Sequence, residues 1–531
     1  MSNTSSRAGT HSHTRAWWKE ATIYQIYPAS FKDSNSDGWG DIQGILQKID
    51  YIASLGVDAV WLSPIFESPQ IDMGYDISDY EKVYGPYGSV KDVEDLIEAC
   101  QKNKNKIILD LVANYTSVQH AWFKESRSSK DNPKRDWMLP TRSMSYFTGS
   151  AWECNEHTEE YYLHLYDKSQ PDLNWENEVC RRAMYNSAMR FWLDKGIDGF
   201  RIDAANKLSK FLPFTDAPIS DPTSFIQPSP TVWCNGPHIH EFLQEMDRDV
   251  LSHYRTYDNQ AIMTVGEVSM CSDPALALPY VSAAQNELNM VLQFDMTHLG
   301  QNSSYNKRYD YTPFKLADVK RITAKWQYFI DGAEAYADDR PEWRVQGAKM
   351  LALWLGAQSG TLFMYQGQEI GMVNAPKEWS MDDYISVDGR KYWSDAMGLD
   401  DEKRRELTKY RLQIMARDYA RLPMQWNGSG NAGFTEEEPW MRRFNRRALR
   451  LRKEHKNVFI YRTFELLYED EKTFVYKKRY GEKVAMVVLN FTTETQPLIG
   501  TGGLKLLVSS YAESLDKEML QPLEGWIYIN Y

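Results

Sequence analysis

The sequence has few of the features that mark a secreted, membrane or nucleic-acid-binding protein. Its 531 residues include only five cysteines, which are widely spaced and form no CxxC pair. An odd and scattered set of this kind is typical of reduced thiols and not of a disulfide framework. Basic residues are in deficit, with 61 Lys and Arg against 73 Asp and Glu and a net charge of −12. That balance argues against binding to nucleic acid or to an anionic membrane, since both need a basic surface.

Long apolar runs are missing as well. No stretch approaches the roughly 20 apolar residues of a membrane-spanning helix. The first residues, MSNTSSRAGTHSHTR, are small and polar and have no apolar core like that of a signal peptide. We therefore expect residues 1–16 to form a disordered tail, and we expect a cytoplasmic, monomeric protein.

Aromatic residues, in contrast, are plentiful, with 18 Trp and 33 Tyr in the chain. Such flat side chains stack on the apolar faces of sugar rings as well as on bases. Because the net charge disfavours nucleic acid, the aromatic excess fits a carbohydrate ligand better. The length exceeds that of one ordinary compact domain, so we expect a large domain with one or two satellites.

Short apolar strands alternate with amphipathic helical stretches from about residue 23. The segments IYQIYP, DAVWLSP and KIILDLVAN predict strands, and IQGILQKIDYIASLG and VKDVEDLIEACQKN predict the helices between them. Further strands are predicted at IDGFRID, AIMTVGEV and GTLFMYQGQ. No Gly-rich phosphate turn follows the first strand. The rhythm therefore predicts an α/β fold of the (β/α)8 TIM barrel type and not a doubly wound sheet.

Polar residues cluster at the carboxyl ends of these strands, on the face where barrel enzymes carry their active sites. The GFRID strand places Arg201 and Asp203 two residues apart, so both side chains share one face. Two interpretations are open. A buried Arg–Asp pair can be purely structural, because a buried charge must be compensated. A carboxylate that a guanidinium keeps ionised can also act as a nucleophile.

Seven motifs along the chain carry a family resemblance. They are IYQIYPASF, DSNSDGWGDIQG, AVWLSPIFESPQIDMGYDISDY, QPDLNWEN, GFRIDAA, VGEV and YQGQEIGM. In this order and spacing they resemble the α-amylase superfamily, glycoside hydrolase family 13, and within it the fungal maltase and oligo-1,6-glucosidase branch. The resemblance implies a barrel domain A over residues 17–114 and 173–446, an inserted domain B over 115–172, and a C-terminal β-sandwich domain C over 447–531. Short alternating runs past Arg447 independently predict an antiparallel β-domain at that end.

The resemblance also implies the roles of the charged residues. Asp203 matches the nucleophile of the family, Arg201 the residue that orients it, and Glu267 the general acid/base. This chemistry needs one ionised carboxylate and one protonated carboxyl group, and retaining glycosidases hold the two about 5–5.5 Å apart. Asp203 and Glu267 are therefore the predicted catalytic pair.

Three further positions are implied to contact the sugar. Asp76 resembles the aspartate of the non-reducing-end subsite, with Tyr75 as its aromatic floor; an ordinary turn aspartate is the alternative. Ala204 follows the nucleophile at a position where the family separates linkage preferences. A small residue there resembles the α-1,4 group more than the α-1,6 group, so we expect a maltose-like α-glucoside as substrate.

An acidic loop follows the first predicted strand. It contains alternating oxygen ligands, namely Asp33, Asn35, Asp37 and Asp41. The pattern begins like an EF-hand, but its twelfth position is Gly44 and not the closing Glu, so an EF-hand is excluded. In relatives these residues hold a structural calcium ion, together with a backbone carbonyl that here would be that of Trp39. A simple acidic turn is the alternative, and no organic cofactor is expected.

Two departures from the family pattern concern the active site. Tyr115 stands where the family has a histidine that donates a hydrogen bond to the bound glucose. The Asn-His-Asp motif of the seventh barrel strand, which supplies the third catalytic carboxylate, is missing. The segment 332–340 is too short and too polar to supply that strand, so we predict a barrel perturbed at strand 7. Asp338 and Asp339 match the acidic pair that follows the lost motif and not the motif itself.

Two functions remain open from the sequence. The first is a retaining α-glucosidase with weak or altered activity that acts through Asp203 and Glu267 on a small α-glucoside. The second is a non-hydrolytic family 13 descendant, either a pseudoenzyme or a catalyst that acts on a non-sugar substrate. The two carboxylates favour the first function, and the missing motif and Tyr115 favour the second.

Overall fold

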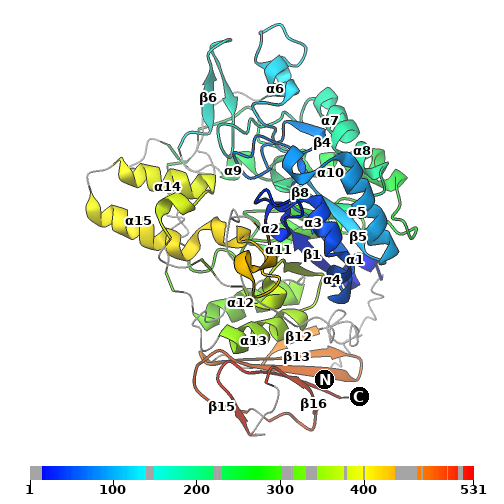
Figure 1. The fold of residues 1–531 in the computed structure, drawn as a ribbon, viewed down its shortest axis with the longest axis vertical. Helices are drawn as coiled ribbons and strands as arrows, with labels where there is room; N and C mark the ends of the chain where they lie inside the picture. Colours follow the sequence, from blue (N-terminus) through cyan, green and yellow to red (C-terminus); the bar gives the residue numbers. More distant parts are fainter. Residues whose placement is uncertain are drawn as a thin grey trace, which may run out of the picture.

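Two β-sheets with helices around and between them organise the molecule (Figure 1). The computed structural model describes residues 15–138, 149–216, 230–301, 315–329, 344–372, 379–398, 401–436, 463–467, 470–498, 500–511 and 518–530, with a few single residues or pairs between them. In this part of the chain, no helix has the length and apolar character to cross a membrane.

The larger sheet is parallel and contains seven strands among the described residues. They are β1 (Thr22–Ile26), β2 (Ala59–Leu62), β5 (Lys106–Val112), β8 (Gly199–Asp203), β9 (Met263–Glu267), β10 (Met290–Leu292) and β11 (Leu362–Tyr365). They lie in the order β10-β9-β8-β5-β2-β1-β11, and every neighbouring pair is parallel. Every residue of β2, β5 and β8 is buried, as expected for strands covered on both faces. The predicted TIM-barrel fold is confirmed.

Among the described strands, the sheet ends at β10 on one side and at β11 on the other. In chain order β10 is the sixth strand and β11 occupies the place of the eighth, and within the described ranges these two strands form the ends of the sheet. The segment 332–340, which we predicted to be too short to form strand 7, lies outside the described residues. The prediction that the barrel is perturbed at this position therefore stays a prediction. Strand β10 itself was not predicted from the sequence.

Helices pack on the outside of the barrel strands. The main ones are α3 (Ile42–Gln47), α4 (Ile49–Ser54), α5 (Val90–Lys102), α7 (Glu178–Met184), α8 (Phe191–Leu193), α10 (Ile239–Asp249), α11 (Pro274–Val281), α12 (Leu316–Phe329) and α13 (Arg344–Gly356). Helix α5 illustrates how the sequence determines where such a helix begins and which face is buried. Ser89 and Asp92 form a capping box at its start, and its buried side chains recur at helical spacing. The apolar face of α5 is thereby directed towards the sheet.

Smaller elements complete the barrel domain and the segment after β5. They are α1 (Trp17–Glu20), α2 (Pro28–Phe31), α6 (Ala121–Ser126), α9 (Pro230–Trp233), α14 (Val387–Met397), α15 (Glu402–Met415), β3 (Phe66–Glu67), β4 (Asp79–Val83), β6 (Trp152–Asn155) and β7 (Glu160–Leu163). The β6–β7 hairpin and α6 project together at the top of Figure 1. Tyr115 and Asp172, the two ends of the predicted domain B, form an antiparallel bridge with each other. The insertion therefore leaves and re-enters the barrel at one point.

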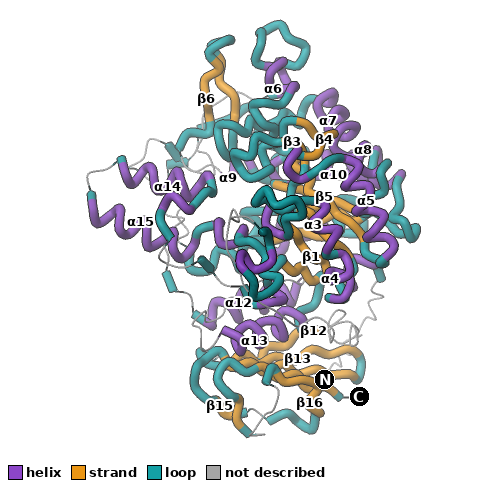
Figure 2. The backbone as a smooth tube through the Cα atoms, viewed as in Figure 1, coloured by secondary structure: helices purple, strands orange, loops and turns teal. Residues whose placement is uncertain are grey.

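The C-terminal sheet is antiparallel. It consists of β12 (Thr463–Leu466), β13 (Thr473–Tyr480), β14 (Lys483–Asn490), β18 (Gly525–Ile529) and β16 (Lys505–Ser509), in this spatial order, with a two-stranded pair β15 (Gln496–Pro497) and β17 (Met519–Leu520). Each neighbouring pair is antiparallel, which confirms the predicted β-domain. The predicted start of this domain, residue 447, lies outside the described residues. Figure 2 shows helices α12 and α13 between this sheet and the barrel.

Candidate active site

The candidate site lies at the carboxyl ends of neighbouring barrel strands. Strand β8 ends with Asp203, and strand β9 ends with Glu267. In the register of the sheet, Arg201 lies beside Asp110 of β5 on one side and beside Val265 of β9 on the other. Because parallel strands end at the same edge, the sheet brings these side chains to one mouth of the barrel.

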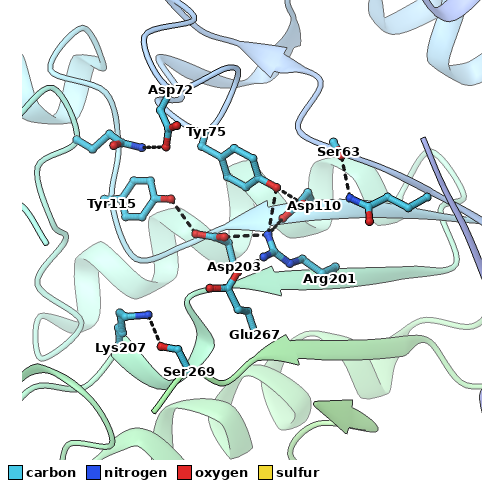
Figure 3. A network of polar contacts seen from close by, with 12 residues as sticks. Ser63, Asp72, Tyr75, Asp110, Tyr115, Arg201, Asp203, Lys207, Glu267 and Ser269 are labelled. Carbon is cyan, nitrogen blue, oxygen red and sulfur yellow. Dashed lines mark hydrogen bonds and ion pairs between the residues drawn. The ribbon is translucent and has the colours of Figure 1, made fainter. Parts of the chain in front are cut away.

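A single guanidinium group holds the carboxylates of the site together (Figure 3). Nη1 of Arg201 donates to Oδ1 of Asp203 at 2.8 Å and to Oδ1 of Asp110 at 2.7 Å. Nη2 of Arg201 donates to Glu267. The Arg201 side chain is 8% exposed, and its guanidinium carbon lies 5.5 Å from the centre of the Trp61 ring. Arg201 thus reaches Asp203, as predicted, and also contacts the other two acids.

Asp110 is a member of this cluster that the sequence analysis missed. Its side chain is fully buried, and it accepts hydrogen bonds from Arg201 and from the hydroxyl of Tyr75, the latter at 3.2 Å. The available signal was an acidic residue inside the otherwise apolar strand KIILDLV, because a buried carboxylate requires a partner. Asp110 lies deeper in the barrel than Asp203, since it pairs in register with Arg201.

Burial changes the acidity of two of the three carboxyl groups. Burial raises the pKa of Glu267, and the nearby Asp203 charge raises it further, while Arg201 lowers it. Burial likewise raises the pKa of Asp110 to about 7, against the opposing effect of Arg201. A raised pKa keeps a proton available on Glu267, which is what a general acid needs.

The relative position of Asp203 and Glu267 follows from their shared partner. Both carboxyl groups bind nitrogens of the same guanidinium, so they lie side by side next to Arg201 (Figure 3). The Glu267 side chain is 15% exposed and Asp203 is 7% exposed, which places Glu267 nearer the solvent. The predicted separation of about 5–5.5 Å between them stays a prediction.

Tyr115 contacts the predicted nucleophile directly. Its hydroxyl donates a hydrogen bond of 2.8 Å to Oδ2 of Asp203, and its side chain is only 1% exposed. Figure 3 shows Tyr115 and Arg201 approaching the Asp203 carboxylate from opposite sides. Both oxygens of Asp203 are therefore hydrogen-bonded by the protein itself. Sequence analysis found the position of Tyr115 but not this contact.

The residue after the nucleophile has an unusual backbone conformation. Ala204 has φ 48° and ψ 37°, in the left-handed region, and it is completely buried. A side chain with a β-carbon costs roughly 1–2 kcal/mol in this region. Such outliers persist where the surrounding structure holds them, and here the turn directs the chain from β8 into the short helix Ala205–Lys207.

The two other predicted sugar-binding residues lie in different surroundings. Tyr75 is half-buried and joins the Arg201 cluster through its bond to Asp110. Asp76 is fully buried, and its carboxylate accepts hydrogen bonds from the hydroxyl of Ser68 and from the amides of Ile71 and Asp72. These bonds hold its own loop together. The contacts of Asp76 thus resemble those of the turn aspartate that the sequence left open as an alternative.

The predicted metal ligands lie together in the loop between α2 and α3. They are Asp33, Asn35, Asp37, Trp39 and Asp41. A calcium ion needs several oxygens directed at one centre. In the structure, Asp33 accepts hydrogen bonds from the backbone amides of Asn35, Ser36 and Gly38. Asp41 caps α3 by accepting a hydrogen bond from the backbone amide of Gly44. Within the described ranges, no group of three or more acidic, His or Cys side chains is arranged to hold a metal ion. Calcium binding stays a prediction.

Asp338 and Asp339, the acidic pair that follows the lost motif, lie outside the described residues. The third catalytic carboxylate of the family therefore has no counterpart at the site in the part of the chain that the structure describes. The site as described consists of Arg201, Asp203, Glu267, Asp110, Tyr75 and Tyr115.

Comparison with known proteins agrees with this geometry. The profile of the alpha amylase catalytic domain matches residues 25–459. The chain belongs to the alpha-amylase family of glycoside hydrolases. It is 44% identical to an alpha-glucosidase of Candida albicans, with 97% of this chain and 99% of that protein covered. It is 40% identical to an oligo-1,6-glucosidase of Saccharomyces cerevisiae, with 97% and 98% covered.

A solved structure also resembles this chain over nearly its full length. The chain superposes on a variant of trehalulose synthase MutB with a TM-score of 0.87 and 31% identity, over 97% of this chain and 100% of that one. The alignment with the Candida relative spans 575 residues, which exceeds the 531 residues of this chain. The relative therefore has segments that this family member lacks.

Proposed function

We propose that this family member is a retaining α-glucosidase, with Asp203 as nucleophile and Glu267 as general acid/base. The observation that carries the proposal is the contact of Arg201 with both carboxyl groups at the mouth of the barrel. An ionised carboxylate and a protonated one beside each other are what double displacement requires. The raised pKa of Glu267 supports its role as the acid.

The proposed reaction has two steps. In the first, an oxygen of Asp203 attacks the anomeric carbon while Glu267 gives its proton to the glycosidic oxygen. The bond to the leaving group breaks, and a glycosyl ester forms on Asp203. In the second, the ionised Glu267 takes a proton from water, whose oxygen attacks the anomeric carbon and breaks the ester. Arg201 holds Asp203 in place throughout.

The substrate class is proposed more narrowly from the relatives. Proteins named alpha-glucosidase and oligo-1,6-glucosidase align with nearly the whole chain. The small Ala204 favours a maltose-like α-1,4-glucoside over an α-1,6-glucoside. We propose weak or altered turnover, because loss of one preorganised transition-state contact costs roughly 10²–10³ in rate. A small α-glucoside is therefore the proposed partner.

The test is turnover of p-nitrophenyl α-glucoside and of maltose by the purified protein. Asp203→Asn should abolish both activities, because it removes the attacking carboxylate. Glu267→Gln should reduce maltose hydrolysis more than p-nitrophenyl glucoside hydrolysis, since nitrophenolate leaves with little help from an acid. Asp136→Asn, in the predicted domain B and outside the Arg201 cluster, is the matched control and should retain wild-type rates. Equal background rates for the wild type and Asp203→Asn would refute the proposal.

A non-hydrolytic role is the second candidate, and one observation favours it. The Tyr115 hydroxyl donates a hydrogen bond to one carboxylate oxygen of Asp203, the proposed nucleophile. If the wild-type protein binds maltose but Asp203→Asn leaves its background rate unchanged, a sugar-binding pseudoenzyme becomes the better description. Binding of neither maltose nor p-nitrophenyl glucoside would favour a non-sugar substrate.

The proposal also covers the compartment, the oligomeric state and the metal content of the protein. All five cysteines lie in the described residues and are free, which supports a reducing, cytoplasmic compartment. We propose a monomer with one structural calcium ion in the loop Asp33–Asp41. Size-exclusion chromatography with light scattering tests the first point, and elemental analysis tests the second.

A further inference from the structure

Each carboxylate oxygen of Asp203 already accepts a hydrogen bond from the protein. Oδ1 of Asp203 accepts from Arg201 at 2.8 Å, and Oδ2 accepts from the Tyr115 hydroxyl at 2.8 Å. In the proposed reaction, one of these oxygens must approach the anomeric carbon to about 3–3.5 Å. Since Oδ1 is the oxygen that Arg201 holds, Oδ2 is the one left to attack. The hydroxyl of Tyr115, 2.8 Å from Oδ2, therefore takes up part of the space through which the reacting carbon must approach.

The backbone of Tyr115 is fixed on both sides. Tyr115 forms an antiparallel bridge with Asp172, and its carbonyl accepts a hydrogen bond of 3.1 Å from the hydroxyl of Tyr80. The amide of the next residue, Thr116, donates to the carbonyl of Pro171 at 3.1 Å. A displacement of the whole segment would break these bonds, so the ring cannot leave by a simple shift of its backbone.

The Tyr115 ring is also packed. Its centre lies 5.0 Å from that of the Tyr166 ring, and both residues belong to the main hydrophobic core. Burial raises the pKa of Tyr115 well above its ordinary value, and the charge of Asp203 raises it further. The phenol is therefore neutral at ordinary pH, and it keeps the proton that it donates to Asp203.

We propose that Tyr115 is a specificity-determining residue that fills the sugar position next to Asp203 and thereby weakens binding of glucose-sized rings. The inference rests on the proposed function for its site, and it makes a separate claim about binding. Even one additional methylene in a pocket changes discrimination by about 10–200-fold. The phenol of tyrosine reaches further than the imidazole of the family histidine, so the effect falls in this range or above it.

Binding of maltose by calorimetry in a Glu267→Gln background, which prevents turnover, tests the proposal. Tyr115→His should tighten maltose binding at least about tenfold, because it opens the position next to Asp203. Tyr115→Phe removes one oxygen atom and should give a smaller gain. Tyr162→His, the same exchange on strand β7 at a tyrosine outside the Arg201 cluster, is the control and should leave the affinity unchanged.

Activity gives a second measurement in the otherwise unmutated protein. Tyr115→His should raise kcat/KM for p-nitrophenyl α-glucoside, chiefly through a lower KM. Unchanged or weaker maltose binding in both Tyr115 variants, with melting temperatures showing that they are folded, would overturn the proposal. Tighter binding without turnover in any variant would support Tyr115 as the occupant while refuting the α-glucosidase function. The proposal for Tyr115 and the proposed α-glucosidase function can therefore be refuted independently.

Discussion

Replacing Arg201 by methionine tests the central contact of the site. Methionine keeps much of the length of the arginine side chain but removes its charge and all its donors. The buried groups Asp110, Asp203 and Glu267 then lose their common partner. Breaking a buried ion pair by removal of one partner costs about 3–5 kcal/mol of unfolding free energy. With three acids on one guanidinium, we expect a loss at or above the upper end of this range near pH 8.

The loss should depend on pH in a defined direction. The folded-state pKa of Asp110 is raised from 3.8 to about 7, so the folded protein binds more protons than the unfolded chain between these values. Its contribution to stability is complete below about pH 3.8 and is lost as the pH rises through 7. Arg201 lowers the pKa of Asp110. Removal of Arg201 therefore raises this pKa further, and the loss of stability with rising pH becomes larger. Arg201→Met should therefore cost clearly less at pH 5, where Asp110 is already protonated.

Urea unfolding followed by fluorescence at pH 5 and pH 8 measures both effects. Arg181→Met is the matched control, because Arg181 pairs with the single carboxylate of Glu245 at 2.9 Å in a less buried position. We expect a smaller loss for Arg181→Met, with less difference between the two pH values. An Arg201→Met variant with wild-type stability at pH 8, or with the same loss at both pH values, would refute this account of the cluster.

Two further predictions concern charged groups away from Arg201. Burial raises the pKa of Asp72 from 3.8 to about 6, so its contribution to stability is lost as the pH rises through 6; Asp72→Asn should remove about 3 kcal/mol of this pH dependence. Urea unfolding between pH 4 and pH 7.5 checks this, and identical curves for variant and wild type would contradict it. If the loop Asp33–Asp41 binds calcium, excess EDTA should lower the melting temperature, because a ligand bound only by the folded state stabilises it. An unchanged melting temperature with no metal by elemental analysis would make the loop an ordinary acidic turn.

The parts of the fold that the sequence predicted are those where local pattern and burial agree. Strand β2 is an uninterrupted apolar run, and β5 is apolar except for its first residue and Asp110. The alternating runs of the C-terminal sheet are equally clear. Strand β10 was missed because it has only three residues, all partly exposed. A segment this short carries no periodic signal, and only its pairing with β9 makes it a strand.

The contacts of the site also divide into those that the sequence could predict and those that it could not. Arg201 and Asp203 are two residues apart on one strand, so their contact follows from strand geometry alone. The contact of Tyr115 with Asp203 joins residues that are 88 positions apart, and it depends on β5 lying beside β8 and on the turn after β5. Asp76 was assigned to the sugar subsite by resemblance, but the bonds of its carboxylate to its own loop could not be read from the motif.

The C-terminal sheet shares a hydrophobic core with the two helices that follow β10 in the chain. Helices α12 and α13, which lie between β10 and β11 in the chain, bury Trp326 and Trp354 in a core shared with β13 and β14, and the Trp354 ring lies 6.1 Å from that of Phe474. Full burial of a large apolar side chain contributes roughly 1.5–3 kcal/mol. This core anchors both helices to the C-terminal sheet. Val291 of β10 packs against the same core, and β10 pairs with the strand that carries Glu267, so the C-terminal sheet also supports the rim of the site.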